Sequence, residues 1–400
     1  MYDLIVVGGG AAGIFAAIQA QAFHPNLSIL VLEKSAKLLS KVRISGGGRC
    51  NVTHHCFEPR KLVQHYPRGN KELISAFTQF GPADTIAWFE SRGVPLKAEA
   101  DGRMFPISNQ SASIIDCLLT EAQKLGVEIR MRQNIEAIEK SDQGFCLKTE
   151  QDQLICQRLL LATGSSRQGY EWAKNLGHTI QTPVASLFGI NISPFALADL
   201  TGVSLPDVRV KIGKKEEQRG PLLITHFGFS GPAILKLSAW QARKLAEKDY
   251  QTQVVISWLP DLSVQEIYDQ LVRLKAEKSK KSLLSLNPFT FPKKLWRRFL
   301  EKAMIDPASL SQILANKELL RLANLLFADP YAMTGKTTNR EEFVTCGGVL
   351  LKEVDFKTMQ SKSCPGLFFA GEILDVDGVT GGFNFQNCWT TAFLVAKSLI

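Results

Sequence analysis

Short apolar runs and a helical pattern alternate at the start of the chain. The first apolar run covers residues 3–7 and the second covers residues 28–32. Between them lie a glycine-rich turn and an apolar helical segment. An apolar run of this length, bounded by turn signals, is typical of a buried strand. The order strand, turn, helix, strand therefore predicts a βαβ unit that ends at residue 33.

The same patterns continue to about residue 190 and return near the C-terminus. A helical pattern from residue 111 leads into further strand-like segments, and residues 366–372 form another buried apolar run. The strand-like segments lie near residues 127–131, 135–138, 145–149 and 159–161. Uninterrupted apolar strands are typical of a parallel sheet that is covered on both faces. We therefore expect one α/β domain built from residues 1–190 and 346–400.

The middle of the chain has a different pattern. Short strand-like segments occur there with frequent Gly and Pro, which predicts a small barrel or sandwich. These segments lie at residues 188–192, 208–212, 222–225 and 254–258. We expect the barrel-like domain to cover residues 191–262 and about 331–345.

Helix start signals follow the barrel pattern. Ser263 to Glu266 form a capping box, Pro292 opens a second helix, and Asp306 with Pro307 gives N-cap and N1 chemistry for a third. They predict a helical subdomain over residues 263–330. The predicted fold class is thus α/β, a Rossmann-like domain with a parallel sheet flanked by helices, interrupted by an inserted β-barrel and a small helical subdomain.

Length and composition exclude several classes of protein. The chain has 400 residues, 45% of them hydrophobic, which is unlike a disordered or fibrous protein. No stretch approaches the roughly 18–20 apolar residues that a membrane span needs. The start, Met1-Tyr2-Asp3, lacks the basic region of a signal peptide. We expect a cytoplasmic protein without membrane contact.

The cysteines predict neither a disulfide framework nor a metal site. There are eight, with no CxxC pair and no zinc-ligand spacing. His54, His55 and Cys56 resemble metal ligands in composition, but no carboxylate stands at a matching distance. Reduced thiols in a cytosolic enzyme are the expectation.

Positive charge is concentrated in one segment. The net charge is +9, and residues 209–302 hold 19 Lys or Arg against 9 Asp or Glu. That segment carries +10, so the remainder sums to −1. Two interpretations remain open, a solvated Lys-rich surface and a binding surface for a polyanion such as nucleic acid.

The turn after the first strand has the spacing of a dinucleotide-binding motif. Gly8, Gly10 and Gly13 form G-x-G-x-x-G between a strand and a helix, and Glu33 ends the next strand. Helix-start amides favour a pyrophosphate, and an acid at this place binds ribose hydroxyls. Because the acid would repel a 2′-phosphate, NAD and FAD are both possible ligands here and NADP is not expected.

The C-terminal region favours FAD over NAD. Residues 371–387 are rich in Gly, contain acids, and precede a helical run. A strand-end acid can hold the ribitol of a flavin, and a helix start places positive dipole beside the ring. Residues 159–164, an apolar strand ending in Ala-Thr-Gly, suggest another close backbone approach to the ligand.

Together these motifs resemble the YhiN/BaiN-like FAD-dependent oxidoreductases over nearly the whole chain. The resemblance is carried by residues 8–13 with Glu33, and by residues 41–53, 102–106, 225–233, 345–349 and 371–386. It implies a split Rossmann-like FAD domain interrupted by a β-barrel and a helical subdomain. Some members are associated with reducing a uridine in ribosomal RNA to dihydrouridine, and others with reducing carbon–carbon double bonds in steroid-like acids.

The motifs and the resemblance together indicate the residues that bind FAD noncovalently. They are Gly8, Gly10, Ala11, Ala12, Gly13, Glu33, Lys34, Lys41, Ser45, Gly46, Gly47, Arg49, Cys50, Asn51, Ile135, Ala162, Thr163, Gly164, Gly371, Glu372, Asp377, Gly378, Gly381, Gly382, Phe383, Asn384 and Gln386. Two residues are candidate proton donors, Cys50 and His226. Each has an alternative interpretation, Cys50 as a buried packing residue and His226 as a structural one.

The expected function is an FAD-dependent oxidoreductase that reduces a C=C bond. Uridine in ribosomal RNA is the favoured substrate, bound through the basic segment 209–302. The alternatives are a reductase or oxidase of a small molecule, such as an enone, a steroid-like acid or an amine, and a non-catalytic flavin-containing binding factor. Only one complete dinucleotide motif is present, so NADH or NADPH would bind transiently as electron donor. The oligomeric state has no signal in the sequence.

Overall fold

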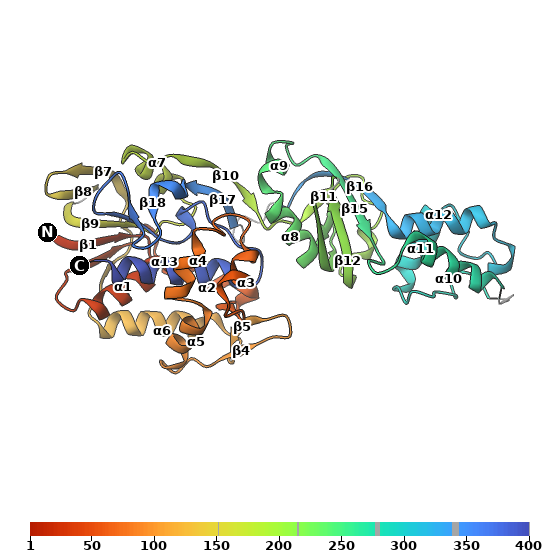
Figure 1. Ribbon diagram of the computed structural model, residues 1–400, viewed down its shortest axis with the longest axis horizontal. Coiled ribbons are helices and arrows are strands. Elements are labelled where there is room, and N and C mark those ends of the chain that lie inside the picture. The colour runs from red at the N-terminus through yellow and green to blue at the C-terminus, as the bar shows by residue number, and fades with distance from the viewer. Residues whose placement is uncertain (151, 214–215, 277–280, 338–343, 400) are drawn as a thin grey trace. The chain divides into compact units, whose positions relative to one another are not determined.

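The computed structural model describes residues 1–400 apart from 151, 214–215, 277–280, 338–343 and 400 (Figure 1). The chain forms two compact units, unit 1 from residues 1–186 and 339–400 and unit 2 from residues 187–338. The sequence predicted a split first domain but placed its boundaries after residues 190 and 345. The boundaries lie earlier because β10 (Ile180–Ser186) pairs with β17 (Val344–Val349) in unit 1, whereas β11 (Ile190–Ile192) belongs to the barrel of unit 2.

Unit 1 is built on a parallel sheet. Its parallel strands, in order, are β20 (Leu367–Phe369), β9 (Gln153–Leu161), β1 (Tyr2–Val7), β2 (Ile29–Leu32) and β6 (Glu128–Arg130). The sheet continues in antiparallel fashion through β18 (Val354–Asp355) and β19 (Gln360–Ser361), and through the hairpin β7 (Ile135–Ser141) and β8 (Gly144–Thr149). Residues 4–7 and 29–32 are buried on both faces of the sheet, which explains their uninterrupted apolar sequence.

Helices cover this sheet. α1 (Ala11–Phe23) packs against both α13 (Phe383–Lys397) and α6 (Ser111–Lys124) (Figure 1). Residues 11–20 of α1 are all buried, so the helix is apolar around its circumference. The other helices of unit 1 are α2 (Ser40–Gly48), α3 (Pro59–Leu62), α4 (Leu73–Gln79), α5 (Pro82–Glu90) and α7 (Arg167–Asn175). A small antiparallel sheet contains β3 (Thr53–His54), β5 (Arg103–Pro106) and β4 (Leu96–Ala98).

Unit 2 contains the predicted barrel, which is closed. Its strands, in order, are β11, β14 (Gly228–Ser230), β13 (Glu216–Ile224), β12 (Ser204–Ile212), β15 (Thr252–Ser257) and β16 (Asp329–Lys336). Alternate side chains of β12 and β15 point inward and are buried, among them Val208, Val210, Val254 and Ile256. Two helices, α8 (Pro232–Trp240) and α9 (Ala242–Ala246), follow β14.

The helical part of unit 2 confirms two of the three predicted helix starts. α10 (Val264–Ala276) begins at the capping box, where the Ser263 N–H donates to Glu266 Oε2 at 2.8 Å. α11 (Lys293–Lys302) follows Pro292. The third start is wrong, because α12 (Asn316–Phe327) begins ten residues after Asp306. Asp306 Oδ1 instead accepts the Ala308 N–H at 2.9 Å, so the Asp-Pro pair forms a local turn.

Candidate functional site

The glycine turn between β1 and α1 combines tight packing with an open face. A Cβ at Gly13 would lie 1.9 Å from the carbonyl oxygen of Gly8, and one at Gly8 would lie 2.4 Å from that of Ala162. A Cβ at Gly10 would have no described atom within 4 Å. Gly8 and Gly13 thus allow the chain to pack on itself, whereas Gly10 leaves the approach to the helix start clear.

The start of α1 has the features of an anion site with a ribose-binding acid beside it. Gly10 is the N-cap residue, and no described side chain caps the helix. Glu33, at the end of β2, accepts the N–H groups of Gly9 and Ser35, each at 2.7 Å. These two bonds fix the carboxylate beside the glycine turn while leaving it further acceptor capacity. The arrangement fits a pyrophosphate at α1 and ribose hydroxyls at Glu33.

The Ala-Thr-Gly segment after β9 lies beside the glycine turn, as the strand order β9-β1-β2 requires. Thr163 Oγ1 is buried, and within the described part of the chain it has no hydrogen-bond partner. A Cβ at Gly169 of α7 would lie 1.9 Å from this oxygen, so the hydroxyl is enclosed against that helix. The open glycine turn and Glu33 at this sheet edge fit a bound dinucleotide such as FAD.

Gln168, on α7, joins two predicted residues and was missed by sequence reasoning. Its side chain donates to the carbonyl of Ile135 at 2.5 Å and accepts from Lys34 Nζ at 3.3 Å. The three residues come from different elements, and Gln168 belongs to no motif that could have signalled it. Gln168 lies where it can position the backbone of Ile135.

The predicted loop from Ser45 to Asn51 is a break in α2. Gly46 and Gly47 have φ of 58° and 69°, values that favour glycine. The Asn51 amide, oriented so that donors meet acceptors, accepts the Gly382 N–H at 2.9 Å and donates to the Thr53 carbonyl at 3.0 Å. This side chain therefore connects the loop to the C-terminal glycine turn, residues 378–382, and the two predicted motifs are neighbours.

Arg49 was predicted to bind FAD, and the structure gives its side chain protein partners. Its guanidinium donates to Glu99 at 2.7 Å and lies 3.9 Å above the centre of the Phe105 ring. Because Glu99 already balances this charge, any contact of Arg49 with FAD stays a prediction.

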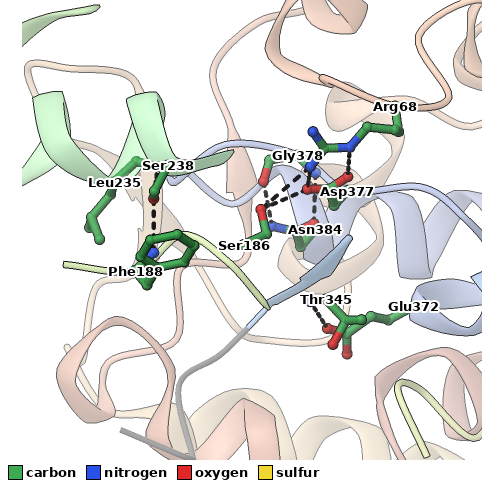
Figure 2. Close-up of polar contacts among 10 residues, drawn as sticks. All are labelled: Arg68, Ser186, Phe188, Leu235, Ser238, Thr345, Glu372, Asp377, Gly378 and Asn384. Atoms are coloured by element: carbon green, nitrogen blue, oxygen red, sulfur yellow. Dashed lines mark hydrogen bonds and ion pairs between the residues drawn. The ribbon is translucent and has the colours of Figure 1, made fainter. Parts of the chain in front are cut away.

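Lys41 and Glu372 form an ion pair that joins α2 to the residues after β20. The other oxygen of Glu372 accepts the N–H of Thr345, at the second residue of β17, at 3.0 Å (Figure 2). Three segments distant in sequence are thus fixed by one carboxylate. Lys41 Nζ also lies 3.4 Å from Ser165 Oγ, next to the Ala-Thr-Gly segment.

Asp377, next to Gly378, forms a buried ion pair with Arg68 (Figure 2). Ser186 donates its hydroxyl to Asp377 at 2.8 Å. Burial raises the pKa of Asp377, and the Arg68 guanidinium opposes that shift. The adjacent loop is held by Asn384, whose side chain accepts the Gly378 N–H at 2.8 Å and donates to the Gly378 carbonyl at 2.9 Å.

Phe383, another predicted FAD residue, begins α13 within an aromatic cluster. Its ring stacks on those of His54 and His65, with centroid distances of 4.7 and 4.4 Å. Tyr66 donates its hydroxyl to the Phe383 carbonyl at 2.6 Å. His54, His65 and Tyr66 were not among the predicted site residues, because aromatic packing between distant segments leaves no local pattern.

Three predicted contact residues are sealed inside the protein. Cys50, Asp377 and Gln386 are each 0% exposed. The Gln386 side chain accepts from Thr53 and Thr85, at 2.5 and 2.9 Å, and donates to a third hydroxyl. None of these three side chains offers accessible surface to a ligand, and their contact with FAD stays a prediction.

The two candidate proton donors differ in accessibility. Cys50 is completely buried, and burial raises the pKa of its thiol to about 12. This agrees with the packing role that was the alternative interpretation. His226 is exposed, in the loop between β13 and β14 of unit 2. Its role as an acid stays a prediction.

No group of three His, Cys, Asp or Glu side chains among the described residues is arranged to hold a metal ion. Likewise, none of the helices formed by those residues is long and apolar enough to cross a membrane.

Comparison with known proteins identifies relatives over the whole chain. Residues 2–398 match the model of the family described as HI0933-like protein Rossmann domain. The ribosomal RNA dihydrouridine synthases of Escherichia coli K12 and Haemophilus influenzae are 30% and 31% identical, over 100% and 99% of this chain and 98% of each relative. The 3-dehydro-bile acid delta(4,6)-reductase of Clostridium scindens is 28% identical over 98% of both chains.

A solved structure confirms the fold. The 3-ketosteroid-delta4-(5alpha)-dehydrogenase of Rhodococcus jostii RHA1 has a TM-score of 0.52 and 14% identity, covering 99% of this chain and 96% of the other. At this identity the likeness concerns the architecture of the chain.

Proposed function

Because this chain belongs to the HI0933-like Rossmann-domain family of FAD-dependent oxidoreductases, we propose that it reduces a carbon–carbon double bond. The proposed substrate is a uridine in ribosomal RNA, which becomes dihydrouridine. The proposed electron donor is NADH or NADPH, and the proposed location is the cytoplasm.

One observation carries the choice of substrate. Two relatives named ribosomal RNA dihydrouridine synthase match this chain over 98% of their own length, so the match includes the inserted unit 2. The +10 charge of residues 209–302 supports the same substrate, because RNA is a polyanion.

When bound, FAD would supply hydride to an electron-poor double bond. The chain supplies its binding and orientation. The amides at the start of α1 would hold the pyrophosphate, Glu33 the ribose, and the Lys41–Glu372 pair would fix the loops on the flavin side.

The proton that completes the reduction needs an accessible donor. Cys50 would keep its proton at neutral pH but is enclosed, whereas His226 is exposed to solvent. We therefore favour His226 over Cys50 as the acid. The variant His226→Gln should lower turnover without changing FAD content.

The test is an assay on RNA that the enzyme has not previously modified. Ribosomal RNA from a strain that lacks the gene is incubated anaerobically with the purified flavoprotein and NADH or NADPH, and dihydrouridine is scored by mass spectrometry. We expect new dihydrouridine at one site. The Gly10→Ala variant, which we expect to bind FAD poorly, is the negative control. Unchanged RNA with a reducible flavin would overturn the proposed substrate.

A small-molecule substrate is the second candidate. It is favoured by the match to the bile acid reductase, which is nearly as similar as the two RNA-modifying relatives. In that case steroid-like enones would reoxidise the reduced flavin, and RNA would not.

A further inference from the structure

Ion pairs among the described residues reduce the positive charge of the basic segment 209–302 unevenly along its length. In the barrel, Arg219 donates to Asp207 and Asp261, and Lys244 donates to Glu216 at 3.1 Å. These carboxylates neutralise the cations beside them. The barrel part of the segment therefore attracts a polyanion less strongly than its number of Lys and Arg residues suggests.

The first half of α11 brings three exposed cations close together. Lys293, Lys294 and Arg297 are exposed, and within the described residues none of them forms a hydrogen bond or an ion pair through its side chain. Lys294 helps to lower the pKa of Asp199, but that carboxylate is already bound by Arg298 at 2.8 Å. We call Lys293, Lys294 and Arg297 the α11 basic surface.

The rest of α11 holds this surface in place. The opposite face of the helix, formed by Leu295, Trp296, Phe299 and Leu300, is buried, and Trp296 Nε1 donates to the Leu283 carbonyl at 3.0 Å. The cations therefore project from a fixed helix, so binding a partner would not require the helix itself to be ordered.

The C-terminal end of α11 is tied to the barrel. Lys302 donates to Asp329 at 2.5 Å. Asp329, at the start of β16, is completely buried and also accepts from Trp258 at 3.0 Å and Tyr331 at 2.6 Å. A satisfied buried network of this kind fixes the helix on the barrel.

Helix stability does not explain the α11 basic surface. Lys293 and Lys294 occupy the first turn, and no acidic residue accompanies them there. Cations in the first turn oppose the helix dipole. Local preferences are broken most often where function requires it. A negatively charged partner bound to these cations would offset their unfavourable interaction with the helix dipole.

We propose that the α11 basic surface binds the phosphate backbone of the RNA substrate. This inference rests on the proposed function and narrows its partner surface from the whole segment to one helix. Lys293 and Arg297 are neighbours on one face of the helix, since residues four apart lie together. Three cations held in this way suit a chain of phosphates, and they would position the RNA without reading its sequence.

The test measures RNA binding as a function of salt. The triple variant Lys293→Gln, Lys294→Gln, Arg297→Gln is compared with the wild type, using labelled ribosomal RNA from the gene-deletion strain in filter-binding assays. Each phosphate contact contributes about 0.7–0.9 to the slope of log K against log salt. We expect the slope to fall by about 2 and the affinity at 0.1 M salt to fall about 100-fold.

A matched control removes the same charge from unit 1. Lys71, Lys174 and Lys357 are exposed and form no side-chain ion pair or hydrogen bond within the described residues. Their replacement by Gln should leave the salt slope within experimental error of the wild type. Equal losses in both variants would show that RNA senses net charge alone and would overturn the inference, as would an unchanged slope in the α11 variant. Flavin content and circular dichroism verify folding.

Failure of the proposed function has a separate signature. If wild-type protein binds ribosomal RNA and loses that binding in the α11 variant, yet forms no dihydrouridine, the surface is correct and the substrate is wrong. If wild-type protein does not bind the RNA at all, the surface is also wrong.

Discussion

Two glycines of the same motif should fail for different reasons when each is replaced by Ala. At Gly13 the new Cβ would lie 1.9 Å from the Gly8 carbonyl oxygen and 3.2 Å from a methyl of Val6. Val6 is buried, and Gly8 is half-buried and donates its N–H to the Leu32 carbonyl at 2.8 Å, so neither can move freely. At Gly10 no described atom lies within 4 Å, and the backbone has φ −84° and ψ −171°, which alanine adopts readily.

The magnitudes follow from these contacts. Nonbonded carbon contacts lie near ~3.5 Å, so Gly13→Ala must open the turn by about 1.5 Å. Overpacking of this kind costs about 3 kcal/mol, which lowers Tm by about 6–12 °C if unit 1 unfolds as a separate unit of roughly 250 residues. Gly10→Ala replaces one N-cap residue by a poorer one and should cost less than about 1 kcal/mol. Its methyl group should nevertheless weaken FAD binding at least tenfold, or about 1.4 kcal/mol.

The assay separates the fold from the cofactor. Both variants are stripped of flavin, melted by far-UV circular dichroism, and then titrated with FAD while flavin fluorescence is followed. We expect a low Tm for Gly13→Ala and a near wild-type Tm with weak FAD binding for Gly10→Ala. Identical melting temperatures for the two flavin-free variants, or wild-type FAD affinity in Gly10→Ala, would refute the reasoning.

Three further predictions concern buried groups. Asp377→Ala should lower the free energy of unfolding by about 3–5 kcal/mol, because Arg68 loses its buried partner. Urea titration measures this loss. If the double variant Asp377→Ala, Arg68→Met loses as much stability as the two single variants added together, the pairing is contradicted. Burial lowers the pKa of His178 below 6.5, so the unfolded chain takes up a proton that the folded one resists and stability should fall as the pH drops through 6.5. Thermal melts from pH 5 to 8 should show this slope reduced in His178→Gln, and an unchanged slope would count against it. Cys50, with a pKa of about 12, should stay unlabelled by iodoacetamide at pH 8, and prompt labelling in a peptide map would show that the site opens.

Much of the fold could be predicted because its signals are local. The strand, glycine turn and helix at residues 3–17 follow one another directly, and the capping box at Ser263 lies within four residues. The segment between residues 53 and 106 gave no prediction of helices or strands. Its elements are two to nine residues long, too short for a hydrophobic period to appear.

The candidate site was predictable where one motif supplies both partners. The glycines of the turn and Glu33 belong to such a motif. Arg68 and Ser186 share no motif with Asp377, because 309 and 191 residues separate them from it in the sequence. Asp377 itself was predicted as a cofactor contact, because an acid in a glycine-rich turn is typical of a cofactor-binding loop. Only the fold reveals that its carboxylate is paired with Arg68.

The division of unit 1 into two sequence segments has a consequence for biosynthesis. The strand β20 lies next to β9 in the middle of the sheet, and α13 packs on α1. A ribosome synthesises β9 and α1 before the barrel, but their respective neighbours β20 and α13 leave it only after the barrel and its helices have been made. Since domains fold as units during translation, unit 2 can fold while the N-terminal segment still waits for its missing strand. Nascent chains should therefore capture flavin only after β20 and α13 have been made.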